Sequence, residues 1–272
     1  MEQKTFGDEL WEICRQHFIR IIQLGELGQL AFSSFEKTIT AIDEKDSEEF
    51  RVHYPIGLNQ DGTPLIGDKS YAADDLKRAY THLSNTELPI TLIYHLVTHT
   101  EAWFSDLVRA IAAKYPKKIG PKKQIAISTA LQATSIQSLR ILATDHLVRD
   151  LTYKSPQDFA ETVTPLFGIN LLEIPPYHKF VELKATRDIY VHNRGIANDV
   201  YVRKANHFAR SKPGELLIVN NQYFLDNYEA VLRLNEAVGD SLLAKWASPL
   251  FEQIQREDRE SQRPDDTATN TP

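Results

Sequence analysis

The chain has 272 residues, of which 42% are hydrophobic and 10% aromatic, so it can bury a sizeable core as one large domain or two small ones. Its formal net charge of -6 argues against nucleic-acid binding through the field of the whole protein. The single cysteine, Cys14, excludes an intrachain disulfide and a cysteine-based metal motif, and its apolar neighbours predict a buried thiol.

The start of the chain lacks the basic and apolar segments of a secretory signal, and no apolar run reaches the length of a membrane span. We therefore expect a cytoplasmic protein with no membrane segment. No glycine-rich phosphate loop, Walker lysine or Gly-x-Ser-x-Gly motif is present in the sequence.

Apolar residues recur at helical spacing from residue 8 to about residue 41, with Asp8 as a candidate cap. Gly25 and Gly28 interrupt this pattern and predict one broken helix or two. Residues 52–70 are dense in turn-forming residues, which predicts a loop or a small hairpin. Together with a short helix expected at residues 71–83, these segments form an N-terminal helical extension over residues 1–87.

The rest of the sequence is dominated by helical periodicity and helix start and stop signals. Helices are expected at about residues 88–115, 125–151, 156–168, 176–195 and 222–246, with a further turn or helix at 198–208. Residues 214–219 predict a short strand. The fold class is therefore all-α, with a helical bundle over residues 88–250 and a polar tail, disordered towards its end, over 251–272.

The helix expected at 88–115 carries two histidines and an acid with alternative interpretations. His95 and His99 have the i, i+4 spacing of zinc ligands on a helix, but no third ligand is evident, so we expect neither a metal nor another cofactor. Glu101 is a candidate partner for Arg187, and a surface charge is the alternative.

The stretch from Ala185 to Gly195 ends an amphipathic helix, and Gly195 is expected to stop it in the left-handed conformation. Arg187 lies within roughly 20° of Phe180 on the apolar face, where a guanidinium needs a carboxylate, a phosphate or an opening to solvent. His192 points roughly 140° away from Arg187 on a straight helix. The two side chains therefore converge only if the helix frays near its end, the arginine bends round, or a second chain contributes.

Further basic residues crowd this region and form a local basic patch on an acidic protein, at Arg187, Arg194, Arg203, Lys204, Arg210 and Lys212. A purely structural interpretation also exists. An arginine held by a core carboxylate and a histidine at a helix C-terminus, where its cation suits the helix dipole, would explain both Arg187 and His192.

The order of helices from about Leu88 to Trp246, with Arg187-Asp188-x-x-x-His192-Asn193-x-Gly195 near the end of a late helix, resembles the HEPN superfamily (higher eukaryotes and prokaryotes nucleotide-binding domain). The resemblance implies a helical bundle that forms a homodimer. Facing motifs of the two chains would form one cleft that cuts RNA without metal, often in toxin-antitoxin or anti-phage systems. It also implies RNA, a second copy of the chain and an antitoxin or defence-system partner as binding partners.

The resemblance assigns roles to individual residues. Arg187 and His192 would be catalytic, and Asp188 and Asn193 would orient them. Arg194 stands where some family members carry a tyrosine that a partner nucleotidyltransferase modifies, so that regulation is not expected here.

Tyr201 is a further candidate for lining the cleft, or else a core residue. These residues predict a metal-independent endoribonuclease, in which histidine exchanges protons and arginine holds the phosphate oxygens. The alternative is a non-catalytic HEPN-like module that binds a nucleotide or a partner protein.

Overall fold

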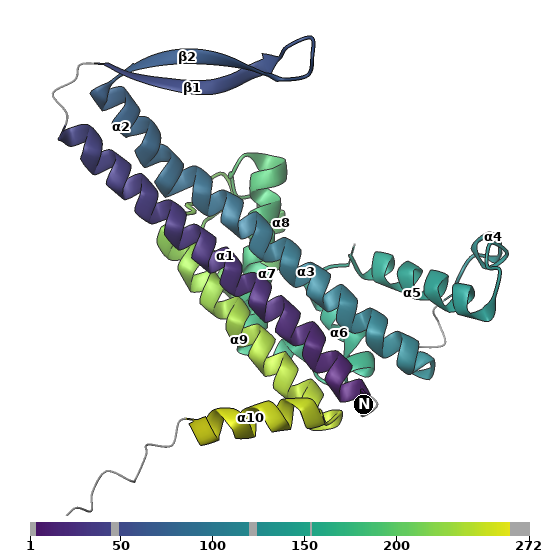
Figure 1. Cartoon of the computed structure of the whole chain (residues 1–272). Helices are drawn as coiled ribbons and strands as arrows, with labels where there is room; N and C mark the ends of the chain where they lie inside the picture. Colours follow the sequence, from purple (N-terminus) through teal and green to yellow (C-terminus); the bar gives the residue numbers. More distant parts are fainter. Residues whose placement is uncertain (1–3, 45–48, 120–123, 153, 262–272) are drawn as a thin grey trace, which may run out of the picture.

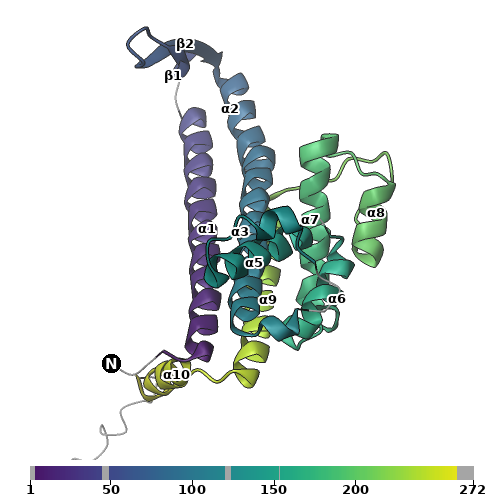
Figure 2. The same ribbon diagram turned by 90° about the vertical axis from the view of Figure 1, so that its right-hand side faces the viewer.

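The computed structural model of this protein describes residues 4–44, 49–119, 124–152 and 154–261. Most of these residues are helical, and a two-stranded sheet stands at one end of the helices (Figure 1). The all-α prediction is thus confirmed. Three long helices, α1 (Phe6–Asp43), α3 (Leu88–Lys114) and α9 (Asn221–Lys245), run side by side, and α7 (Pro175–Asn193) packs against α3 and α9 (Figures 1 and 2).

Shorter elements complete the described chain. In order they are β1 (Glu49–Leu58), β2 (Pro64–Ala72), α2 (Ala73–His82), η1 (Leu83–Glu87), η2 (Pro116–Lys118), α4 (Ile127–Ala130), α5 (Ile136–Thr152), α6 (Pro156–Phe167), η3 (Leu171–Glu173), α8 (Asp199–Ala205), η4 (Asn206–Phe208) and α10 (Pro249–Ser261). No helix among the described residues is both long and apolar enough to cross a membrane.

Helix α1 is continuous over 38 residues, which corrects the expectation of a break at its two glycines. A Cβ atom on Gly25 would lie 2.6 Å from the Tyr228 ring of α9, and one on Gly28 would lie 3.0 Å from Leu92 Cδ1 of α3. The glycines therefore allow close helix packing and do not end the helix. The cap is Thr5, whose hydroxyl accepts a hydrogen bond from the amide of Asp8, while the Asp8 carboxylate accepts one from the Thr5 amide.

Helices α2 and α3 form one helical run, joined by the π-helical segment η1. Pro89 has no N–H, and its ring crowds the carbonyl four residues earlier, so the regular ladder cannot pass through this point. The run continues instead through a wider turn, in which the Leu88 amide donates to Leu83 O. The expected boundary between residues 87 and 88 thus falls inside a continuous helical run.

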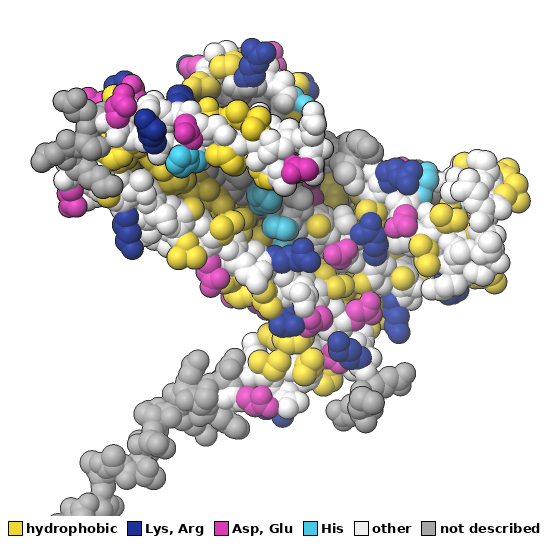
Figure 3. All heavy atoms as spheres, turned by 45° about the horizontal axis from the view of Figure 1, so that its top comes forward, with side chains coloured by type: hydrophobic (Ala, Val, Ile, Leu, Met, Phe, Trp, Pro, Cys, Tyr) yellow, Lys and Arg dark blue, Asp and Glu magenta, His cyan; other side chains and the backbone are white. Residues whose placement is uncertain are grey.

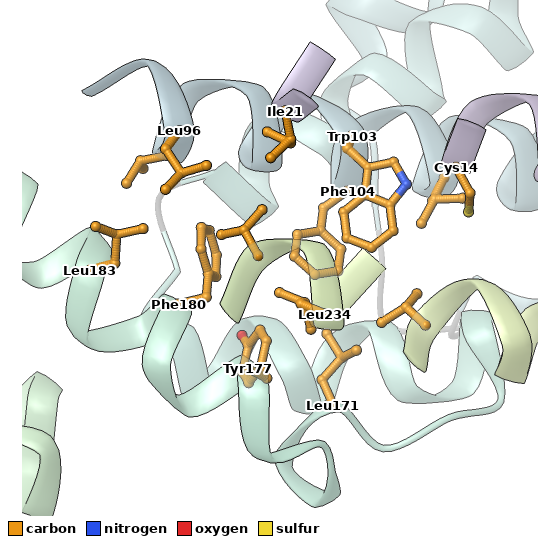
Figure 4. Packing of buried hydrophobic residues seen from close by; sticks show 14 of the residues in the cluster. Cys14, Ile21, Leu96, Trp103, Phe104, Leu171, Tyr177, Phe180, Leu183 and Leu234 are labelled. Carbon is orange, nitrogen blue, oxygen red and sulfur yellow. The ribbon is translucent and has the colours of Figure 1, made fainter. Parts of the chain in front are cut away.

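The main core joins α1 to the helices that follow it, so residues 1–87 are not a separate extension. Cys14 and Ile21 of α1 belong to the same buried cluster as Leu96, Phe180 and Leu234, which come from α3, α7 and α9 (Figure 4). Cys14 is buried in this cluster, as predicted, and burial raises the pKa of its thiol to about 12. Each large apolar side chain buried here contributes roughly 1.5–3 kcal/mol.

The turn-rich segment forms an antiparallel hairpin that projects from the end of the bundle (Figure 1). Strand β1 pairs with β2 from Glu49↔Ala72 to Leu58↔Pro64, with a register shift between Pro55 and Gly57. Of the loop and the small hairpin expected at 52–70, the hairpin is thus the one present, with its turn at Asn59–Thr63. Gly62 supplies the positive φ of 82° that this turn requires.

Two other expectations, around residue 130 and at residues 214–219, are corrected. The helix expected at 125–151 is divided into α4 and α5, because Ser135 and Ser138 exchange side-chain bonds with each other's amides and start a new helix. The strand expected at 214–219 is reduced to an isolated bridge between Ile196 and Leu216. In the polar tail, α10 continues to Ser261, and residues 262–272 lie outside the described residues.

Candidate functional site at the end of helix α7

Helix α7 is buried along two faces, and this fixes the position of the motif. Phe180 and Leu183 pack into the main core, while Ala185 and Ile189 pack into a second cluster with Tyr201 and Leu217. Because α7 packs on two sides, it is more restricted than a surface helix that packs on one side only. The last two turns of α7 are therefore held rigidly between α3, α8 and the segment that precedes α9.

The helix ends at Asn193, and the next two residues are both left-handed. Arg194 has a φ of 53° and Gly195 a φ of 81°, and the Gly195 amide donates to Ile189 O at 3.3 Å. A Cβ atom on Gly195 would lie 3.1 Å from both the Tyr190 ring and Leu216 Cδ1, so this position requires glycine for space as well as for conformation. The expected stop at Gly195 is present, with Arg194 as the cap residue.

Arg187 lies in an alternating row of charged side chains, which we call the ion-pair chain: Lys184, Glu101, Arg187, Asp188 and Lys204. Arg187 Nη2 donates to Glu101 Oε2 at 3.0 Å, and Arg187 Nε lies 3.2 Å from Asp188 Oδ1. Lys184 Nζ is 2.6 Å from Glu101 Oε1, and Lys204 Nζ is 3.2 Å from Asp188 Oδ2. The row holds three cations and two anions, so it keeps a positive excess that an added phosphate would neutralise.

The guanidinium of Arg187 is only partly committed by these contacts. Its side chain is 23% exposed. Its Nε is buried and has no hydrogen-bond partner among the described residues, because the approach to Asp188 lacks hydrogen-bond geometry. A guanidinium has five N–H donors, so donors remain for a ligand. The expectation that Glu101 pairs with Arg187 agrees with the contact in the structure.

His192 occupies the last turn of α7 and is exposed. It makes no hydrogen bond or ion pair within the part of the chain that the structure describes. Because α7 remains helical through Asn193, the helix does not fray, and no contact joins His192 to Arg187. Within one chain, the ion-paired Arg187 and the exposed His192 are therefore not brought together.

The supporting residues fall into two groups. Asn193 donates its side-chain amide to Ile196 O and so secures the turn after α7, while Arg194 is exposed beside it. Tyr201 is only 1% exposed, and its hydroxyl donates to Glu182 Oε1 at 2.8 Å. Tyr201 therefore belongs to the core behind α7 and does not line the surface that carries His192.

The sequence analysis missed the buried acid Glu182. Its carboxylate accepts hydrogen bonds from Thr186, Tyr201 and Tyr223 at 2.7–2.8 Å and from Arg210 Nε at 3.1 Å. Burial raises the pKa of Tyr201 to about 12 and the pKa of Tyr223 well above its ordinary value, so both stay neutral donors. The burial of Glu182 could have been predicted from a second apolar stripe of α7, at Ala185 and Ile189. Glu182 and Thr186 lie on the same face as this stripe and are buried with it.

His95 and His99, the two histidines with ligand-like spacing, lie one turn apart on α3. Among the described residues, no group of three or more His, Cys, Asp and Glu side chains is arranged to hold a metal ion. The rings of His95 and His99 lie 6.1 Å apart between centroids. Burial lowers the pKa of His99.

No family model, curated protein or solved structure matches this chain. The case for a function therefore depends on the residues themselves. On the face shown in Figure 3, Lys and Arg side chains are intermingled with Asp and Glu side chains, so this face carries no extended field of one sign. On this face, any attraction for a polyanion must come from local groups of charge.

Proposed function

We propose that the protein is a metal-independent endoribonuclease whose site combines Arg187 and His192 from two chains. The observation that supports it best is their state at the end of α7. Arg187 is held by two carboxylates yet keeps free donors, and His192 is exposed and unengaged. An antitoxin or defence-system partner, as the HEPN resemblance implies, belongs to the same proposal.

The chemistry requires one proton to be removed, one to be delivered and one charge to be stabilised. The ribose 2'-oxygen attacks the adjacent phosphorus as its proton passes to an imidazole, and the bond to the 5'-oxygen breaks as that oxygen receives a proton. The products are a 2',3'-cyclic phosphate and a free 5'-hydroxyl. An imidazole can take the first proton and, as imidazolium, give one to the 5'-oxygen, while a guanidinium fork suits the phosphorane oxygens, so His192 and Arg187 fit these roles.

A second chain supplies what one chain lacks. In one copy the imidazole and the guanidinium point to different sides of a regular helix. A two-fold axis beside the end of α7 would set His192 of one copy opposite Arg187 of the other. The rival function is a non-catalytic binding module. It is supported by the carboxylate partners that Arg187 already has, because a structural arginine would have them too.

The decisive experiment is incubation of wild type and His192→Ala with RNA, with and without EDTA. We expect cleavage that survives chelation, leaves a 2',3'-cyclic phosphate and falls by at least ~10²-fold in the variant. His82→Ala, an exposed histidine on α2, is the matched control and should cleave like wild type. A folded His192→Ala protein with wild-type cleavage would refute the proposal, as would a reaction that EDTA stops and a divalent metal restores.

A further inference from the structure

A pocket separate from the end of α7 lies between the start of α6, the first half of α7 and the turn after α8. Its volume is about 370 Å³, and it is lined among others by Ser155, His178, Arg203, Lys204, His207 and Phe208. This volume falls within the range of roughly 300–1,000 Å³ that is typical of small-ligand sites. The sequence analysis assigned no role to these histidines or to Phe208.

Aromatic rings form one side of the pocket. The ring of Phe208 lies 4.3 Å from that of His207 and 6.1 Å from that of His178, and it is nearly parallel to the His178 ring at 11°. Asn206 turns the chain sharply at the end of α8, with a φ of 50° and a ψ of -129° that lie outside the left-handed helical region favoured by asparagine. The exposed His207 ring is tilted by 41° to the half-buried Phe208 ring, so the two offer a ring face with a second aromatic edge beside it.

Cations form the other part of the lining. Arg203 is exposed, and Lys204 is 33% exposed while it pairs with Asp188. Within the described part of the chain, the side chains that line the pocket include no carboxylate. A groove that joins aromatic rings to cations is the usual way in which proteins bind single-stranded nucleic acid: the bases stack and the phosphates pair.

The pocket is connected to the candidate site through the ion-pair chain. Asp188 contacts Lys204 at the pocket and Arg187 at the candidate site, at 3.2 Å in each case. A strand whose phosphate reaches Arg187 can therefore continue along the ion-pair chain towards Lys204 and the pocket. Neutralisation of Lys204 by an RNA phosphate would also free Asp188 to orient Arg187.

We propose that this pocket binds one nucleotide of single-stranded RNA next to the cleaved bond, with its base on Phe208 and His207 and its phosphate at Arg203 and Lys204. The inference rests on the proposed function for the position of that nucleotide relative to the cleaved bond. Binding itself does not depend on cleavage, so the two ideas are tested separately.

The test is fluorescence anisotropy with a labelled 2'-O-methyl oligoribonucleotide of about ten nucleotides, which lacks the attacking hydroxyl and cannot be cleaved by this route. Arg203→Ala should weaken binding by about tenfold and reduce the salt dependence of log Kd by about 0.7, the value for one phosphate on a single strand. His207→Ala and Phe208→Ala should weaken binding by about tenfold without changing the salt dependence. Arg51→Ala, an exposed arginine on β1 of the hairpin, is the control and should bind like wild type.

Wild-type affinity in both Arg203→Ala and His207→Ala would refute RNA binding by the pocket. Both side chains are exposed, so this result does not depend on whether Phe208→Ala folds. Cleavage of an all-ribose oligonucleotide is measured in parallel. Pocket-dependent binding without any cleavage by wild type would leave the pocket standing and refute the endoribonuclease. Cleavage that needs His192, together with unchanged affinity in the pocket variants, would support the endoribonuclease and refute the pocket.

Discussion

At the scale of single residues, Glu182 does more than any other side chain to fix the region behind the motif. This carboxylate is 5% exposed and accepts hydrogen bonds from four side chains, which come from α7, α8, α9 and the segment between α8 and α9. A buried carboxylate without such donors would be strongly destabilising. Arg210 also stacks 3.8 Å above the centre of the Tyr223 ring and donates to Ile218 O, so it ties the same elements together.

Tyr201 provides a test of whether this network is structural. Tyr201→Phe removes the bond to Glu182 and the bond that the Tyr201 hydroxyl accepts from the Arg210 amide at 3.0 Å. We expect the free energy of unfolding, measured by urea denaturation, to fall by about 1–3 kcal/mol, while the folded variant cleaves RNA like wild type. Tyr54→Phe, which removes an exposed tyrosine hydroxyl on the hairpin, should change neither quantity. Loss of cleavage at unchanged stability would return Tyr201 to the site.

At the scale of elements, predictions succeeded where the cause is local. Helix α6 begins at residue 156 as expected, because its cap is local: the Ser155 hydroxyl needs only the amide of Asp158, three residues away. Gly25 was misinterpreted because its role is to make room for Tyr228, about two hundred residues later, and no local pattern reports such a contact. The same limit applies to the motif. Arg187 in an apolar stripe signals the need for a carboxylate, whereas its link through Asp188 to Lys204 depends on where α8 lies.

The contact between α1, α3 and α9 contains a buried histidine that makes stability depend on pH. His17 is 3% exposed, Asn235 Nδ2 donates to its Nδ1 at 2.9 Å, and its ring stacks on Trp103. Burial lowers the pKa of His17 to about 3. The unfolded chain takes up this proton below about pH 6.5, whereas the folded protein resists it until about pH 3.

The stability that comes from His17 is therefore complete above pH 6.5 and is lost as the pH falls towards 3. We expect the free energy of unfolding to decrease by up to about 1.4 kcal/mol per pH unit through this window, beyond the effect of other groups. His17→Gln keeps an acceptor for Asn235 and does not titrate, so it should remove that part of the slope. Denaturant titrations of both proteins between pH 7 and pH 4 measure it, and parallel slopes would contradict the assignment.

At the scale of the whole molecule, the proposed site predicts that two inactive variants will rescue each other. Arg187→Ala and His192→Ala each lack one group, but a mixed dimer retains Arg187 in one chain and His192 in the other. Mixing the two variants under conditions that exchange subunits should restore cleavage to a substantial fraction of the wild-type rate. Each variant incubated alone under the same conditions is the control and should stay inactive. Mixtures that stay inactive while mass measurements show mixed dimers would refute the composite site.

Helix α1 packs against α9 and against Ser248 beyond it, so the order of synthesis affects when the end of α7 reaches its final position. Ser248 donates to the Asp8 carboxylate across 240 residues of sequence, and Asn235 reaches Cys14 O across 221. During synthesis, the apolar stripe of α1 and the carboxylate of Glu182 must wait for α9 to emerge from the ribosome, because their partners lie there. A nascent or truncated chain that stops after Gly195 therefore contains the whole motif without the helix that packs behind it, and the end of α7 can reach its described geometry only after α9 has been made.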